Sequence, residues 1–184
     1  MKLFMILLGA MPKGRRIEQH DIFFGIAENL RELIPGINAA WPDALGKIHI
    51  DGWREVNYVD GFTVSVKAKT ETIAGESKTK LFFINLGGYK ENEFEEFHYK
   101  MIVVGENKGT AVQKAKQTAF YKHTGFQGAP SHIDDRYGVD VDDAFEIEEI
   151  LSDEMKQKYA VIVSRAENVQ EDEIHLGYYV FDKL

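Results

Sequence analysis

Short apolar runs that end at glycine recur along the chain and predict strands. Residues 2–8 and 80–86 form two such runs, and each is followed by a segment rich in aromatic and β-branched residues, at 20–26 and 97–104. A helix-forming segment comes next in each half. These segments are 28–34, with an extension past Pro35 to Trp41 left open, and about 110–121, which is rich in Ala, Gln and Lys.

The remaining pattern predicts extended segments and a C-terminal hairpin. Extended chain is expected at 55–67 and at 144–150, and a hairpin is expected from 159–164 with 174–181. The polar stretch 70–79 is expected to join the two halves.

Alternate residues of the two apolar runs are identical, which predicts a shared buried face. They are Phe4, Ile6 and Leu8 in the first run and Phe82, Ile84 and Leu86 in the second. Because alternate side chains point to opposite sides of a sheet, we expect the helices to cover this face. The opposite face of the first run carries Leu3, Met5 and Leu7. If it has no cover within the chain, it predicts a subunit interface.

The chain aligns with itself, which indicates an internal duplication. At an offset of 78, ten of the 28 residues from Lys2 to Asn29 are identical, where chance gives about two. A second block matches at an offset of 83 and pairs His49-Ile50-Asp51 with His132-Ile133-Asp134 and Phe62 with Phe145. The recurrence of the apolar N-terminal run inside the chain favours a fold element over a signal peptide, and hence a cytoplasmic protein.

These patterns together predict an α+β fold. We expect two β-β-α-β units that pack through a mainly antiparallel sheet, with helices on one face. The first repeat is assigned to residues 1–72, the second to 79–155, and the C-terminal hairpin that packs on them to 156–184.

Composition narrows the classes of function. The chain has 184 residues and a formal net charge of −8, which argues against nucleic-acid binding because that affinity comes largely from neutralising phosphates. It has no cysteine, which excludes disulfides and thiolate metal sites. The apolar run at the start is too short to cross a bilayer, so no membrane partner is expected.

The polar residues that recur in both halves are the candidates for chemistry. They are Glu18, His20, His49 and Asp51 in the first half and Glu96, His98, His132 and Asp134 in the second. In each Glu-x-His or His-x-Asp pair an extended backbone places an imidazole beside a carboxylate, as a general base or a metal ligand requires. The same pairs could instead tie strand ends and loops together by hydrogen bonds. Structural, metal-binding and acid–base interpretations stay open, and we assign no metal ligand and no cofactor.

The loop after the first strand carries a second candidate site. Lys13, Arg15 and Arg16 surround Gly14, and three cations around a glycine can clasp a phosphate or a carboxylate. A solvated hairpin tip explains the same residues. The second half has a mostly acidic loop in this place.

Three stretches carry a resemblance to a known family. Lys13–Gly25, Lys47–Val56 and His132–Asp143 are similar to a small bacterial family catalogued as domain of unknown function 1543, whose members carry one or two copies of the domain. The resemblance extends over about residues 1–150. It implies a duplicated, bacterial, cytoplasmic protein, and it implies no activity and no catalytic residue.

The sequence lacks the common nucleotide-binding, serine-hydrolase and zinc-protease motifs. We therefore expect a non-catalytic binding or interaction module whose partner is a second copy of itself, another protein or a small anionic molecule. The alternative is an enzyme or a divalent-metal-binding protein that uses the duplicated Glu-x-His and His-x-Asp pairs.

Overall fold

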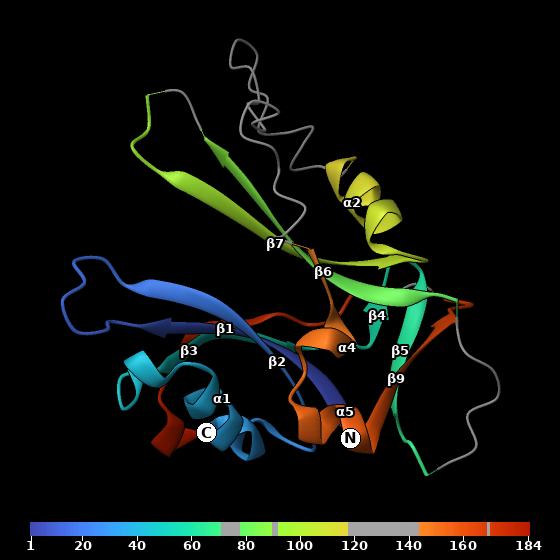
Figure 1. Ribbon diagram of the computed structural model, residues 1–184, viewed down its shortest axis with the longest axis horizontal. Coiled ribbons are helices and arrows are strands. Elements are labelled where there is room, and N and C mark those ends of the chain that lie inside the picture. The colour runs from blue at the N-terminus through green and yellow to red at the C-terminus, as the bar shows by residue number, and fades with distance from the viewer. Residues whose placement is uncertain (71–77, 90–91, 118–143, 169) are drawn as a thin grey trace. The chain divides into compact units, whose positions relative to one another are not determined.

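The structure is a computed structural model that describes residues 1–70, 78–89, 92–117, 144–168 and 170–184. It contains two compact units (Figure 1). Unit 1 comprises Met1–Glu76 together with Ile150–Leu184, and unit 2 comprises Ser77–Glu149. The C-terminal segment therefore returns to the unit that the N-terminal segment begins.

Unit 1 holds two antiparallel sheets. Their strands are β1 (Lys2–Ala10), β2 (Gln19–Ala27), β3 (His49–Glu55), β4 (Tyr58–Val59), β5 (Phe62–Ala68), β9 (Tyr159–Arg165) and β10 (His175–Tyr179). One sheet has the order β10-β3-β1-β2 and the other has the order β4-β5-β9. Strand β1 is thus central in the first sheet, and the apolar N-terminal run is part of its core.

The core of unit 1 lies on the face of β1 that the sequence predicts. Phe4, Ile6 and Leu8 are fully buried there, and Leu33 and Ile37 cover them from short helices on that side of the sheet. On the opposite face Leu3 is buried and Met5 and Leu7 are half-buried. The sequence predicts a subunit interface only if this face of β1 has no cover within the chain. Leu3 is covered, so the condition is not met there.

The covering layer consists of a 3-10 helix that runs into an α-helix. The elements are η1 (Leu30–Leu33), α1 (Ile34–Ala40) and η2 (Pro42–Ala44). Asn29 caps η1, since its side chain accepts a hydrogen bond from the Glu32 backbone N–H. Pro35 lies in the first turn of α1, where a proline lacks no helical hydrogen bond. The helical region thus extends past Pro35, which is the longer of the two possibilities that the sequence left open. The C-terminal segment adds α5 (Asp153–Lys158) and the 3-10 helix η4 (Phe181–Lys183).

The described residues of unit 2 form an antiparallel sheet of order β7-β6-β8. Its elements are β6 (Lys80–Tyr89), β7 (Glu96–Gly105), α2 (Lys108–Lys116), β8 (Ala144–Glu146) and α4 (Ile147–Ile150). Phe82, Ile84 and Leu86 are buried against the two alanines that α2 turns inward, Ala111 and Ala115. The predicted buried face is confirmed in this unit as well.

The two hairpins share one register at an offset of 78. Lys2 pairs with Ala27 and Gly9 with His20 in β1–β2, while Lys80 pairs with Gly105 and Gly87 with His98 in β6–β7. Asn107 caps α2 in a reciprocal capping box with Thr110, as Asn29 caps η1.

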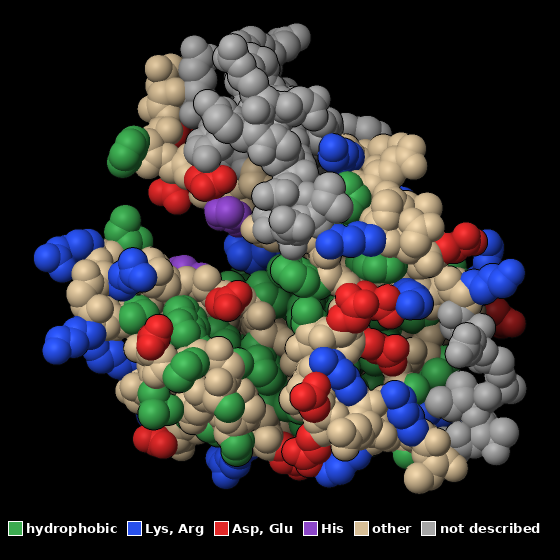
Figure 2. All heavy atoms as spheres, in the orientation of Figure 1, with side chains coloured by type: hydrophobic (Ala, Val, Ile, Leu, Met, Phe, Trp, Pro, Cys, Tyr) green, Lys and Arg blue, Asp and Glu red, His purple; other side chains and the backbone are tan. Residues whose placement is uncertain are grey.

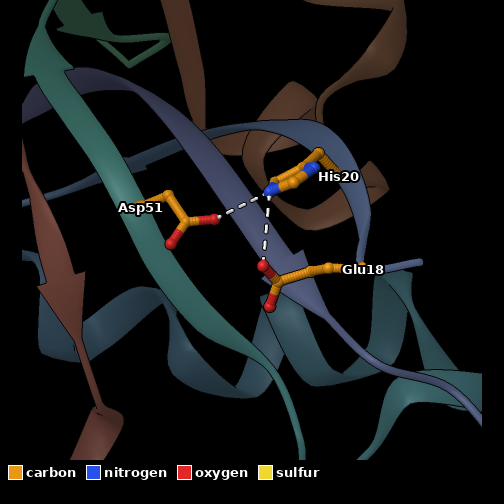
Figure 3. Close-up of side chains that lie close together, drawn as sticks. All are labelled: Glu18, His20 and Asp51. Carbon is orange, nitrogen blue, oxygen red and sulfur yellow. Dashed lines mark ion pairs between the residues drawn. The ribbon is translucent and has the colours of Figure 1, made fainter. Parts of the chain in front are cut away.

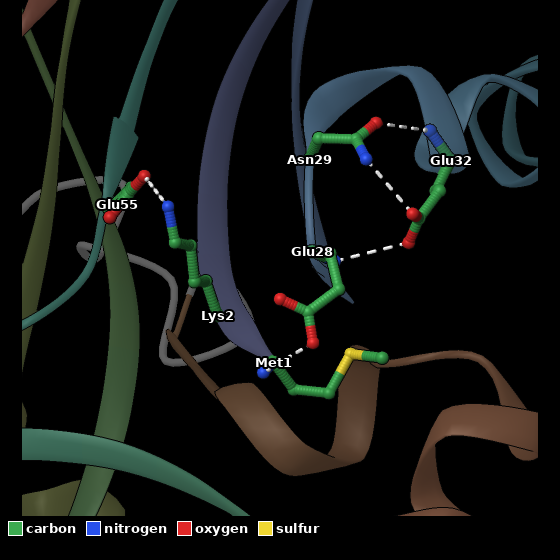
Figure 4. A network of polar contacts seen from close by, with 6 residues as sticks. All are labelled: Met1, Lys2, Glu28, Asn29, Glu32 and Glu55. Carbon is green, nitrogen blue, oxygen red and sulfur yellow. Dashed lines mark hydrogen bonds and ion pairs between the residues drawn. The ribbon is translucent and has the colours of Figure 1, made fainter.

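Both hairpins also carry the same ion pair at their first residue. Lys2 binds Glu55 at 2.6 Å (Figure 4), and Lys80 binds Glu146 at 2.9 Å. The hydrogen bond and the charge of Glu146 raise the pKa of Lys80 above its usual value. Met1 and Glu28 add a neighbouring ion pair in unit 1, through the terminal amine.

Several expected elements differ from the structure. His49 and Asp51 lie within strand β3, whereas the sequence predicts extended chain only from residue 55. The segment 55–67 is not one extended piece, because Asp60 and Gly61 both have positive φ and form a two-residue turn between β4 and β5. An Asp-Gly pair between apolar residues is a strong signal for such a hairpin turn.

The prediction of a C-terminal hairpin is wrong. Strand β9 pairs with β5 and strand β10 pairs with β3, so the two C-terminal strands belong to different sheets of unit 1. The acidic turn between them therefore joins two sheets and does not close a hairpin.

The second half also departs from the expected pattern. The segment 144–150 is extended only in β8 and continues as helix α4. Glu146 pairs with Phe82 as Glu55 pairs with Phe4, so β8 takes the place of β3 at an offset of 91, and Phe145 is not the counterpart of Phe62. Helix α2 begins at Lys108, and the expected helical residues 118–121 lie outside the described residues.

The described residues form antiparallel sheets with short helices, which confirms the α+β class. Among the helices of these residues, none is both long enough and apolar enough to cross a membrane.

Candidate metal centre

Two strands and the end of a loop bring four polar residues of unit 1 together. Glu18 closes the loop before β2, His20 lies on β2, and His49 and Asp51 lie on β3. We call Glu18, His20, His49 and Asp51 the His–carboxylate cluster. Figure 3 shows three of its members, with the carboxylates of Glu18 and Asp51 pointing toward the imidazole of His20.

The register of the strands explains why the two histidines lie close together. Gly9 on the central strand pairs with His20 on one side and with His49 on the other. Directly paired residues point to the same side of a sheet, so both imidazoles rise from the face that Gly9 occupies. That face is opposite to the one on which Phe4, Ile6 and Leu8 are buried.

Each imidazole of the cluster lies between two carboxylates. His49 Nε2 is 3.1 Å from Glu18 Oε1 and 3.2 Å from Asp51 Oδ1. His20 Nε2 is 3.2 Å from Asp51 Oδ2 and 3.8 Å from Glu18 Oε2. Donor atoms that share a metal at bond lengths of about 2.1 Å are about 3.0–3.4 Å apart in octahedral or tetrahedral geometry. Three of the four distances fall in that range.

Two atoms of the cluster are buried and make no hydrogen bond within the described residues. His49 is 5% exposed, and its Nε2 atom and Asp51 Oδ2 have no hydrogen-bond partner in the described part of the chain. Their contacts are short enough for ion pairs but do not have hydrogen-bond geometry. Buried polar atoms are normally satisfied, so this pair needs an explanation such as an ion. Glu18, His20 and Asp51 form a group whose donor atoms all lie within 4.8 Å of one another, close enough to hold a metal ion, and His49 is not a member of this group.

The backbone is shaped around the cluster at two places. The β1–β3 pairing runs from Gly9 and His49 to Leu8 and Ile50 and then skips to Gly52, so Asp51 is the extra residue of a β-bulge. A side chain at Gly9 would overlap Asp51 Oδ2, and its Cβ would lie 2.5 Å from His49 Nε2. Gly9 thus leaves the space that the cluster occupies.

Tyr178 is a site residue that the sequence did not reveal. Its ring lies against the His49 imidazole with centroids 4.3 Å apart, although the tyrosine itself is 71% exposed. The sequence predicts extended chain at 174–181, and β10 is an edge strand of its sheet. Its position beside His49 follows from the β10–β3 pairing, for which no local signal exists. The sequence shows that a glycine ends the first apolar run in both halves. It does not indicate that Gly9 leaves room for the side chains of His49 and Asp51.

The second half repeats only part of this arrangement in the described residues. Glu96 and His98 lie at the same register of β7, 3.9 Å apart, and the Asn85 amide donates to His98 Nδ1 at 2.8 Å. Leu7 stands at the equivalent position of β1. His132 and Asp134 lie outside the described residues, so the convergence of the second set stays a prediction.

The cations of the predicted anion site lie beside the cluster in the chain. Lys13, Arg15 and Arg16 are exposed on the loop between β1 and β2. Basic side chains gather at the left of Figure 2, where Figure 1 places this loop. Anion binding by these residues stays a prediction at this point.

Two imidazoles and two carboxylates can act in two ways. Without a metal, each carboxylate orients an imidazole for proton transfer. With a divalent metal bound, these groups would supply its ligands, and the metal would polarise a substrate oxygen or lower the pKa of bound water. The exposure of His20 and Glu18, each nearly half exposed, leaves one side of the cluster accessible.

Comparisons with known proteins agree with this fold and leave the activity open. Residues 15–66 match the model of a family described as Domain of Unknown Function (DUF1543), and this segment contains all four residues of the cluster. The family model matches this one segment. The resemblance seen in the sequence suggested two copies of the domain over about residues 1–150. A search of curated proteins gives no match.

The chain is also similar to a solved structure, described as a crystal structure of a protein Il1583 from Idiomarina loihiensis. The sequences are 19% identical, and the alignment covers 97% of this chain and 95% of that chain with a TM-score of 0.61. This similarity shows a shared fold.

Proposed function

We propose that this chain is a divalent-metal-binding protein whose ligands are the His–carboxylate cluster. The observation that carries the proposal is that two buried atoms, His49 Nε2 and Asp51 Oδ2, make no hydrogen bond to any described residue although other donor atoms lie at coordination-like distances. A buried polar atom without a partner costs about 1–3 kcal/mol, and a bound cation removes that cost. A purely structural tie would be expected to satisfy these atoms with hydrogen bonds.

The donor set favours a first-row transition metal. Calcium and magnesium take oxygen ligands, whereas imidazole is preferred by zinc, iron and nickel. A mixed set of two imidazoles and two carboxylates suits Zn²⁺, Fe²⁺ or Mn²⁺. Metal-assisted hydrolysis or group transfer is the enzymatic form of this proposal, since the accessible side of the cluster leaves room for a water or a substrate.

Metal content and affinity test the proposal directly. The full chain is titrated with Zn²⁺ and Mn²⁺ in competition with a chelator, together with His49→Ala and Asp51→Asn. Each substitution removes one donor and should weaken metal affinity by at least about 100-fold, more than a change outside the ligand shell costs. His175→Ala is the matched control, because His175 stacks on Trp53 and belongs to a different part of the same sheet. Its affinity should stay within about twofold of the wild type.

The unfolding free energy separates metal binding from a structural tie. His20 is nearly half exposed, so His20→Ala should change the stability of the metal-free chain by no more than about 0.5 kcal/mol while abolishing tight binding. If neither cation binds the wild type, the proposal is wrong. A large loss of metal-free stability in His20→Ala, with metal affinity unchanged, would favour the structural interpretation.

An interaction module, with a second copy of the chain as its partner, is the second candidate. The observation that favours it is a group of exposed apolar side chains around β10: Ile174, Leu176 and Tyr178. Exposed apolar groups of this kind are common at interfaces. Native mass spectrometry tests it, because a dimer has twice the mass of the 21.0 kDa chain. A monomer at micromolar concentration would argue against it.

We also propose that the two hairpins are tandem copies of one ancestral unit in a bacterial, cytoplasmic protein. The shared register at an offset of 78, the paired asparagine caps and the paired Lys–Glu contacts support the duplication. The family resemblance supports the bacterial setting. A high-resolution structure of residues 118–143 is the measurement that tests the second copy.

A further inference from the structure

We propose that the metal of the His–carboxylate cluster holds a small oxyanion, a phosphate or carboxylate group, and that Lys13, Arg15 and Arg16 provide the balancing charge. This inference rests on the proposed metal site and adds the class of ligand that the site takes. It begins from the loop that joins β1 to β2.

Both ends of this loop are attached to the cluster. Strand β1 passes Gly9, which borders the cluster, and ends at Ala10, while Glu18 closes the loop as a cluster member. Arg16 is two residues from Glu18, and two residues of extended chain span at most about 7 Å. One arginine side chain covers a distance of this order.

The charges of the loaded site favour an anion. A metal ligand histidine is neutral, so the carboxylates of Glu18 and Asp51 balance a divalent metal and the loaded cluster has a net charge of zero. The loop adds three positive charges, and residues 11–17 contain no acidic side chain. In the described part of the chain, no ion pair joins Lys13, Arg15 or Arg16 to a carboxylate. The loaded site therefore has an excess of positive charge.

Coordination chemistry supplies the place for the anion. Four protein donors leave two positions of an octahedral metal open, and the exposed edges of His20 and Glu18 face solvent. One oxygen of an oxyanion can occupy the metal, and its other oxygens can accept hydrogen bonds from a guanidinium, whose planar fork matches carboxylate and phosphate. The chain is acidic as a whole, which disfavours a polyanion, so a small ligand fits better.

The test uses the full chain loaded with Mn²⁺, a paramagnetic probe of bound ligands. Inorganic phosphate is observed by ³¹P relaxation and acetate by relaxation of its methyl protons, with and without the loaded protein. We expect faster relaxation of at least one anion with the loaded chain, and none with the metal-free chain. A response from phosphate alone or from acetate alone supports the inference and identifies the group.

Substitutions in the loop test the role of the cations. The double variant Arg15→Gln/Arg16→Gln should weaken anion affinity about tenfold, the size expected for one charge-assisted hydrogen bond, while Mn²⁺ affinity stays equal or rises. Lys67→Gln on β5 is the control and should change neither. Lys13→Gln gives a milder variant whose affinity should lie between those of the wild type and the double variant.

The failures are distinguishable. If the wild type binds no Mn²⁺, the metal site itself is wrong. If Mn²⁺ binds but neither anion relaxes faster, the metal site stands and the oxyanion inference is overturned. If the double variant retains full anion affinity, the loop has no part in binding and the inference is equally overturned.

Discussion

At the scale of single residues, the most specific feature of the site is Gly9, whose lack of a side chain leaves room for the His–carboxylate cluster. Gly9 lies in regular extended strand, so its role is space and not a positive φ. A Cβ at this position would meet Asp51 Oδ2 and His49 Nε2, and both of these atoms are buried. The position therefore couples the backbone of β1 to the donor atoms.

Gly9→Ala should weaken metal affinity by at least about tenfold, because misplacing donor atoms by a fraction of an ångström degrades a coordination site. The fold should persist, since alanine is tolerated in a strand. Chelator competition measures the affinity, and circular dichroism checks the fold.

Gly87→Ala is the matched control for this change. Gly87 has the same register in the second hairpin, and its Cβ would meet only the flexible carboxylate of Glu96, at 3.2 Å. We expect wild-type metal affinity. Equal losses in the two variants would contradict a specific role for Gly9.

Tyr178 gives a second test at this scale. Its ring covers the buried imidazole of His49, and an aromatic pair contributes about 0.5–1.5 kcal/mol beyond its buried area. Tyr178→Ala should therefore weaken metal affinity by about two- to tenfold, through a less fixed imidazole. Tyr178→Phe keeps the ring and should retain wild-type affinity. Loss of affinity in both variants would instead assign a role to the hydroxyl group.

At the scale of elements, the sequence predicted the halves of the site but not their convergence. Glu18 with His20 and His49 with Asp51 are two residues apart, and spacing alone places each pair on one side of the chain. Their meeting depends on β1 lying between β2 and β3 and on the bulge at Asp51. Both are long-range pairings, and residue spacing within a segment does not determine long-range pairings.

The same limit explains which strands were predicted. β1, β2, β6 and β7 were found because each hairpin has two strong apolar segments close in sequence. The sequence also predicts the two C-terminal strands. It predicts the wrong partner for each, because strands that are neighbours along the chain are expected to pair with each other. Each instead completes a sheet begun by the N-terminal segment, β9 on β5 and β10 on β3.

Capping gives a prediction at the element scale. Asn107 accepts from the Thr110 backbone N–H and starts α2, whose inward alanines cover the core of unit 2. Asn107→Ala should destabilise this unit by about 1 kcal/mol, the usual value for a lost cap. Hydrogen exchange of the α2 and β6 amides measures the loss. Asn107→Asp keeps an acceptor and should preserve stability, and a loss as large as that of Asn107→Ala would contradict the capping role.

At the scale of the whole molecule, all the residues assigned to the proposed metal site belong to unit 1. The four members of the His–carboxylate cluster, Gly9, Tyr178 and the cationic loop come from its two segments, Met1–Glu76 and Ile150–Leu184. Each unit has its own buried core, and every strand of unit 1 pairs within that unit. A unit with its own core and complete strand pairing is expected to fold without the other.

Replacing residues 71–149 with a Gly/Ser linker tests this expectation. The Lys69 backbone N–H donates to the Lys158 carbonyl at 2.9 Å, so the end of β5 lies at the end of α5, a helix about 9 Å long. A linker of about ten residues spans roughly 16–19 Å and is long enough to join the two ends. The shortened chain should bind one metal ion with the affinity of the full chain, as chelator competition measures, and His49→Ala in it should abolish tight binding. If the shortened chain folds cooperatively but does not bind metal, unit 2 contributes to the site, and the assignment of the metal site to unit 1 alone is wrong.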